Sequence, residues 1–126
     1  MPPMPPAENE MTARASSIRK ILAYVEEKPD AVIGLMPEGR DEPERILVPP
    51  FPGTGRFMLQ LARRGLDILP CGLYEADGTL FVRFGLPYSL EVPPELKNDE
   101  RDREASRIVM SAIAALLPEE MRGAYS

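Results

Sequence analysis

The chain has 126 residues, 15 prolines, no histidine and a net charge of −5. This length fits one domain with one modest core, and the negative charge disfavours nucleic acid and anionic lipid as partners, because both attract clustered Lys and Arg. The lack of histidine excludes reactions in which this chain itself supplies an imidazole base.

The single cysteine, Cys71, cannot form an internal disulfide, which fits a reducing cytoplasm. No apolar run reaches the roughly 20 residues of a membrane helix, and the N-terminus lacks the regions of a signal peptide. The sequence therefore predicts a cytoplasmic protein with at most peripheral contact at the inner face of the membrane. Cys71 is expected to be buried in the core, and no metal site is predicted, because no His/Cys cluster exists.

The chain begins with a segment rich in proline and methionine. Residues 1–13 predict a disordered tail, because little apolar surface offsets the entropy lost on ordering. Residues 14–126 are expected to form one α/β domain. Its first element is a helix from Ser16 to Lys28, with apolar residues at spacings of three and four. Pro29 ends this helix.

The next three segments predict a strand, a loop and a helix. The continuous apolar run Ala31–Met36 is typical of a strand buried on both faces in a parallel sheet. The charged loop Pro37–Gly53 exceeds the roughly 12–15 residues that compact domains usually allow, and such loops are often functional. A helix is predicted over Thr54–Arg64, with Thr54 as its cap and Gly65 as its left-handed terminator.

The following segments predict a second strand and a hairpin. Ile68–Tyr74 has the composition of a buried strand, although Pro70 conflicts with a central position in a sheet. Asp77-Gly78 is a hairpin-turn signal, and Thr79–Phe84 is predicted to be the strand that follows it.

The clearest periodicity predicts a last helix that Asn98 or Asp99 caps at its start and that Pro118 ends. Its carboxylates are expected to form a solvated face (Glu100, Asp102 and Glu104). The element order predicts an α/β fold: a small mixed sheet with a βαβ unit, a hairpin strand and flanking helices. In such sheets ligands bind beyond the carboxyl ends of the strands, so the loop Pro37–Gly53 is the predicted site.

Two segments of this region are candidates for binding an anion. In Glu38-Gly39-Arg40, a guanidinium beside a glycine turn can bond two oxygens of a phosphate; the alternative is a solvated surface ion pair. In Gly53-Thr54-Gly55, the free N–H groups of a helix start attract anions; the alternative is a plain junction between loop and helix. No catalytic residue is predicted in this chain.

Four segments, taken in order, carry a resemblance to a known family. They are Ile33-Gly34-Leu35-Met36-Pro37-Glu38-Gly39, a connection with Leu47, Pro49, Pro50 and Phe51, then Gly65-Leu66-Asp67-Ile68-Leu69-Pro70-Cys71, and Phe84-Gly85-Leu86-Pro87-Tyr88. The first is similar to a Phe-Pro-Glu-Gly-Thr-Arg block, the third to a Gly-x-Pro-Ile-x-Pro-Val strand, and the fourth to x-Gly-x-Pro-Ile. Residues 18–125 thus resemble the C-terminal half of the glycerophospholipid (1-acylglycerol-3-phosphate or lysophosphatidate-type) acyltransferase family.

The resemblance implies a substrate and a set of binding residues. Glu38, Gly39 and Arg40 would hold the phosphate of a glycerol-phosphate or lysophospholipid acceptor. The family's threonine is missing here, so Arg45 becomes a rival to Arg40. The acyl donor would be acyl-CoA or an acyl-carrier protein as co-substrate, with no cofactor. The family's base is a histidine in a His-x4-Asp motif upstream of this region, and this chain has no histidine.

The sequence therefore predicts a phospholipid/glycerol acyltransferase-like protein that is incomplete and inactive alone. It would be a truncated product, or half of a split domain whose histidine lies on a second chain. The first alternative is a non-catalytic phosphate- or lipid-binding module or subunit. The second is an unrelated small α/β domain with a coincidental Pro-Glu-Gly turn. Expected partners are the acceptor, a chain that carries the His-x4-Asp half or a second copy in a homo-oligomer, and no nucleic acid.

Overall fold

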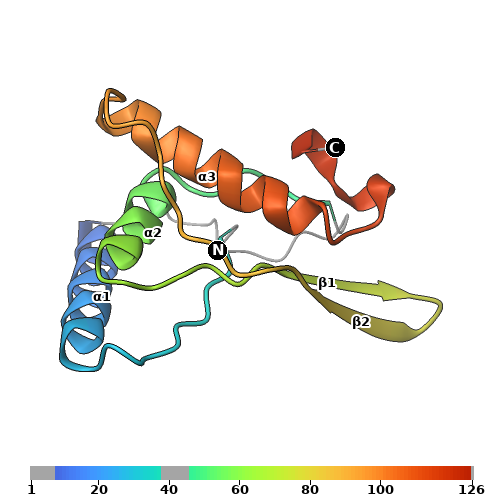
Figure 1. Ribbon diagram of the computed structural model, residues 1–126, viewed down its shortest axis with the longest axis horizontal. Coiled ribbons are helices and arrows are strands. Elements are labelled where there is room, and N and C mark those ends of the chain that lie inside the picture. Colours follow the sequence, from blue (N-terminus) through green and yellow to red (C-terminus); the bar gives the residue numbers. More distant parts are fainter. Residues whose placement is uncertain (1–7, 38–45, 126) are drawn as a thin grey trace. The chain divides into compact units, whose positions relative to one another are not determined.

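A computed structural model describes residues 8–37 and 46–125, with side chains from residue 16 onward (Figure 1). Within these residues the fold is mixed α/β, with three helices and one two-stranded antiparallel sheet. The chain divides into two compact units, residues 1–33 and 34–126, and each is described by itself. In the part of the chain that is described, no helix combines the length and apolar character needed to cross a membrane.

The first unit contains helix α1, Glu8–Glu27. This helix begins eight residues before the predicted start at Ser16, so residues 8–13, which the sequence assigned to a disordered tail, are helical. The last proline of the N-terminal segment is Pro6, and the residues that follow it include good helix formers such as Glu, Met, Ala and Arg. The helix ends before Pro29, as predicted. Residues 1–7 of the predicted tail lie outside the described residues.

In the second unit, helix α2 spans Thr54–Arg63, close to the predicted bounds. Gly65 terminates it with a φ of 90°, which confirms the predicted left-handed stop. The Gly65 N–H donates to Ala62 O at 3.0 Å and the Leu66 N–H to Leu61 O at 3.3 Å. These two bonds form the Schellman arrangement and satisfy carbonyls that the helix end would otherwise leave unpaired.

Helix α3, Asn98–Ala114, packs against α2 and builds the first part of the core. Asn98, one of the two residues predicted to cap this helix, is its first helical residue, and Lys97 is the N-cap; the helix ends four residues before Pro118. The buried side chains of this first cluster come from α2, α3 and the segment before α3 (Met58, Leu59, Leu90, Ala105 and Val109). A second cluster lies at the C-terminal end of α3 (Leu47, Met110, Ala114 and Leu117). Two short 3₁₀ turns follow, Glu119–Met121 and Gly123–Tyr125.

Strands β1, Cys71–Ala76, and β2, Thr79–Phe84, form an antiparallel hairpin with Cys71 opposite Phe84 and Ala76 opposite Thr79. The turn residues Asp77 and Gly78 both have positive φ, 51° and 75°. Positive φ at both central positions matches the right-handed twist of the strands, so the predicted turn is confirmed.

The conflict raised by Pro70 disappears because β1 begins after this residue. Pro70 has no N–H to donate, and its carbonyl accepts a hydrogen bond from Gly85 N at 2.9 Å. Ile68, which the sequence placed inside the strand, instead forms an isolated antiparallel bridge with Tyr88.

The predicted parallel strand Ala31–Met36 is wrong, and with it the βαβ unit. These six residues form neither helix nor strand, and Val32 is 93% exposed. A parallel strand needs partners along its edges and cover on both faces, whereas β1 and β2 are bonded to each other in a two-stranded sheet. The argument that placed a site at the carboxyl ends of parallel strands therefore loses its basis.

The two faces of the hairpin differ. On one face, Gly72 and Gly85 lie against Leu116, just past the end of α3, where an added Cβ at Gly72 would come within 2.6 Å of Leu116 Cβ. On this same face Tyr74 packs on the second core cluster, and its ring stacks on Phe81 with 5.1 Å between centroids. Cys71 alternates with Gly72, so it lies on the opposite face and is exposed. The prediction of a buried Cys71 was therefore wrong.

The hydroxyl of Tyr88 is buried and has no hydrogen-bond partner among the described residues. An unpartnered buried hydroxyl costs about 1–3 kcal/mol, so its removal without a change of shape is neutral to stabilising. We expect Tyr88→Phe to raise the free energy of unfolding by about 1 kcal/mol, measured by urea denaturation near neutral pH.

Burial also raises the pKa of the Tyr88 phenol above its ordinary value of 10.0. As the pH rises above that value, the unfolded phenol releases its proton before the folded one, so the stability of the wild type falls with pH. The advantage of Tyr88→Phe should therefore widen in alkaline buffer. A variant less stable than the wild type at neutral pH would show that the hydroxyl has a partner.

Candidate functional site

The predicted binding residues fall into two groups. Glu38, Gly39, Arg40 and Arg45 lie outside the described residues. The structure places Gly53, Thr54 and Gly55 at the start of α2, beside the first turns of α3. The part of the candidate site that the structure describes is therefore formed by the starts of α2 and α3.

The chain enters α2 through a turn that requires glycine. Gly53 is the N-cap residue with a φ of 95°, in the left-handed region that side chains disfavour. Thr54, predicted to be the cap, is instead the first helical residue. Its N–H donates to Phe51 O at 3.2 Å, and Phe57 N donates to Gly53 O at 3.0 Å as the first bond of the helix. Gly53 has no side chain to cap the helix, so the cap comes from elsewhere.

That cap is the carboxylate of Asp102, from the second turn of α3. Its Oδ2 accepts a hydrogen bond from Gly53 N at 2.9 Å, and its Oδ1 accepts one from Arg56 N at 2.9 Å. A carboxylate at a helix N-terminus satisfies unpaired N–H groups and interacts favourably with the helix dipole. Amides at the helix start that the sequence predicted to bind a ligand anion are thus bonded to a carboxylate of the protein itself. This favours the alternative interpretation, in which residues 53–55 are a plain junction between loop and helix.

Gly55 explains how α3 comes close enough for this cap. An added Cβ at Gly55 would collide with the carbonyl oxygen of Asp102 and lie 2.8 Å from Ser106 Oγ. Glycine therefore lets the backbones of the two helices meet at this point. Gly55 is a packing residue, and its role in the site is to position Asp102.

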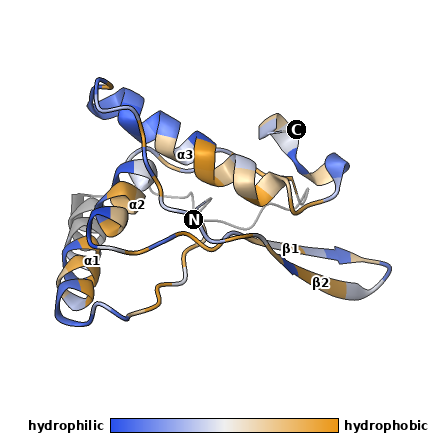
Figure 2. Cartoon of the chain, viewed as in Figure 1, coloured by the Kyte–Doolittle hydropathy of each residue, from blue (hydrophilic) through white to orange (hydrophobic). Residues whose placement is uncertain are grey.

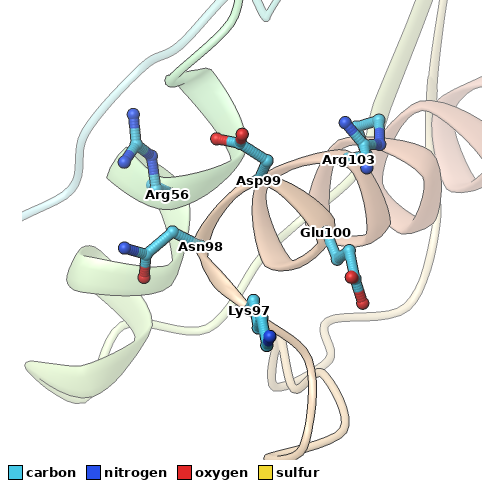
Figure 3. Close-up of a pocket in the computed structure, with 6 residues that line it drawn as sticks. All are labelled: Arg56, Lys97, Asn98, Asp99, Glu100 and Arg103. Carbon is cyan, nitrogen blue, oxygen red and sulfur yellow. The ribbon is translucent and has the colours of Figure 1, made fainter.

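A shallow depression of about 470 Å³ lies next to this cap (Figure 3). Arg56 enters it from α2, and the other lining residues come from the start of α3 (Lys97, Asn98, Asp99, Glu100 and Arg103). Three cations and two carboxylates share the surface, so neither sign dominates. Such a mixed, solvated surface favours no particular anion or cation.

Farther along α3, Glu104 accepts a hydrogen bond from Arg107 Nε at 3.1 Å. This bond lowers the pKa of the Glu104 carboxyl. The pair is a surface feature, and Glu104 and Glu100 match the predicted solvated face. Asp102 does not, because its carboxylate is committed to α2. Within the described residues no group of three His, Cys, Asp or Glu side chains could hold a metal ion.

No family model matches this chain, and no curated protein or solved structure does either.

Proposed function

We propose that this chain forms the acceptor-binding half of a glycerophospholipid-type acyltransferase domain. In the complete reaction, an acyl group passes from a thioester to a hydroxyl of a glycerol-phosphate or lysophospholipid acceptor. That step needs a base for the hydroxyl proton, which is worth about 10²–10⁴-fold in rate. These 126 residues contain no histidine, so in this proposal the base comes from outside them.

The observation that carries the proposal is the placement of two segments that resemble the family. Residues 65–71 and 84–88 lie side by side. Ile68 N donates to Tyr88 O at 2.8 Å, Tyr88 N donates to Ile68 O at 2.9 Å, and Gly85 N donates to Pro70 O at 2.9 Å. This pairing continues the β1–β2 hairpin past Cys71 and Phe84, so the two segments that resemble the family form one structural unit, and this unit is what supports the proposal.

The Asp102 cap reduces the set of residues that we propose to bind the acceptor phosphate. Gly53 N and Arg56 N already donate to a carboxylate, and a phosphate placed beside Asp102 would meet a negative charge. The proposal therefore assigns the phosphate to Arg40, with Arg45 as the second cation, and leaves Gly53, Thr54 and Gly55 a structural role.

The test is a titration of the full chain with glycerol 3-phosphate, followed by NMR. We expect Arg40→Ala to weaken binding by about 10- to 150-fold, the equivalent of a charged hydrogen bond worth about 1.5–3 kcal/mol. Arg56→Ala is the matched control, because its side chain lines the mixed-charge depression instead. Equal binding by wild type and Arg40→Ala, or no binding by the wild type, would contradict the proposed site.

A second arm measures acyl transfer from acyl-CoA to lysophosphatidate by the purified chain. The proposal expects no turnover above the uncatalysed rate, because the base is missing. Robust turnover by the chain alone, abolished in Arg40→Ala, would show that the chain is a complete enzyme and would contradict the assignment of half a domain.

A further inference from the structure

The hairpin carries a continuous apolar strip on the face that points away from α3. Side chains alternate along a strand, so every second residue shares this face. In the register of the hairpin, Leu73 lies opposite Val82 and Cys71 lies opposite Phe84. We call the apolar part of this face the outer strip (Cys71, Leu73, Leu80, Val82 and Phe84, with Leu69 and Leu86 next to the strand ends). Glu75, opposite Leu80, shares the face at its turn end. Figure 2 shows much of β2 in the hydrophobic colour.

The outer strip is open to solvent. Its six large apolar side chains are between 50% and 87% exposed, with Val82 the lowest and Leu86 the highest. At roughly 100 Å² for each such side chain, the strip presents about 600 Å² of apolar surface. This is at the upper end of the largest patch on a typical monomer, roughly 300–600 Å², and such patches usually mark an interaction site.

The opposite face of the hairpin is already occupied. Leu116 fills the space over Gly72 and Gly85, and Arg83 Nη1 donates to Leu116 O at 3.4 Å. Tyr74 completes the second core cluster from the same side. The outer strip therefore belongs to no core among the described residues of this unit. A hairpin of two strands with one bare apolar face also needs further cover to be stable by itself.

We propose that the outer strip of one chain packs face to face against the outer strip of a second copy, forming a two-fold dimer. About 600 Å² per partner is at the lower limit of the roughly 600–1,000 Å² per partner that stable interfaces bury. A two-fold interface uses one patch on both subunits and must be complementary to itself. The middle of the strip meets this condition, because Leu73, Val82 and Phe84 carry no charge, and the carboxylate of Glu75, which shares this face of the strands, lies at its turn end opposite Leu80.

The register indicates how two strips would fit. A two-fold axis that crosses the strands midway between Val82 and Phe84 brings Phe84 of one copy over Val82 of the second and keeps Glu75 at the edge of the contact. Large side chains then meet smaller ones, as in sheets that pack about 10 Å apart. Cys71, opposite Phe84, becomes buried in this arrangement and is a built-in probe of it. The inference does not rest on the proposed acyltransferase function.

The test uses the full chain in analytical ultracentrifugation from about 1 to about 200 μM. We expect a monomer–dimer equilibrium, with Val82→Asp weakening the dimer at least about 100-fold, because a charge would be buried without a partner. Val32→Asp is the matched control: it places the same charge on a 93% exposed valine outside the strip and should leave the dimer intact.

Two measurements distinguish a loss of dimerisation from a failure of the variant to fold. Circular dichroism must show wild-type helix content for Val82→Asp. In addition, Val82→Thr keeps the β-branched shape that suits a strand and should still weaken the dimer about 10-fold by removing apolar contact.

The thiol of Cys71 gives an independent readout. Its rate of reaction with a soluble aromatic disulfide should fall as the wild-type concentration rises, and should not depend on concentration in Val82→Asp. The proposal is overturned if the wild type stays monomeric up to the highest concentration, or if it dimerises equally well as Val82→Asp.

Discussion

Gly55→Ala will lower the free energy of unfolding by about 3 kcal/mol, although Gly→Ala in an exposed helix normally stabilises by about 1 kcal/mol. The added Cβ would collide with the carbonyl oxygen of Asp102 and lie 2.8 Å from Ser106 Oγ. A backbone carbonyl cannot rotate away, so α2 and α3 must separate. The separation would also strain the Asp102 cap and the cluster around Met58 and Val109.

The measurement is urea denaturation followed by circular dichroism. Gly34→Ala is the matched control, because nothing lies within 4 Å of a Cβ at Gly34; we expect a change within about 0.5 kcal/mol. If Gly55→Ala were as stable as the wild type, the close crossing of α2 and α3 would be absent in solution.

Asp102→Ala is expected to lower the free energy of unfolding by about 2–3 kcal/mol. The substitution removes both hydrogen bonds to the start of α2, at Gly53 N and Arg56 N. Loss of a helix cap costs about 0.5–2 kcal/mol, and hydrogen bonds to a charged group are stronger than neutral ones.

Two further variants complete this measurement. Asp102→Asn keeps one carbonyl acceptor and should fall between Asp102→Ala and the wild type. Asp67→Ala removes an exposed carboxylate elsewhere and should change stability by no more than about 0.5 kcal/mol. Equal effects of Asp102→Ala and Asp67→Ala would mean that Asp102 is part of the solvated face that the sequence predicted.

The parts of the fold that short-range signals determine could be predicted. Asp77-Gly78 fixes the hairpin turn, and β2 has the predicted bounds because the turn sets where it begins. Gly65 ends α2 for an equally local reason, a left-handed residue. The run Ala31–Met36 failed because six apolar residues do not say whether a neighbouring strand exists to pair with them. Cys71 was misplaced for a similar reason, since its burial depends on which face of the hairpin α3 covers.

The candidate site shows the same division between local and distant information. The sequence predicted, from Gly53 and the helix N–H groups alone, that the start of α2 binds the anion of a ligand. It did not reveal that a carboxylate of the chain itself bonds to Gly53 N and Arg56 N. Asp102 lies 49 residues from Gly53, inside a helix whose acidic residues all have the appearance of a solvated face. Nothing near Gly53 in the sequence points to Asp102, so a contact in space was needed.

The distance along the chain between Asp102 and α2 has a consequence for biosynthesis. Arg56 leaves the ribosome 46 residues before the carboxylate that caps its helix. Until then the nascent α2 is a short helix with an unsatisfied start, and short isolated helices are marginal in water. The docking of α3 therefore completes two helices at once, which makes folding of residues 54–114 a late, cooperative event that depends on contacts of high sequence separation.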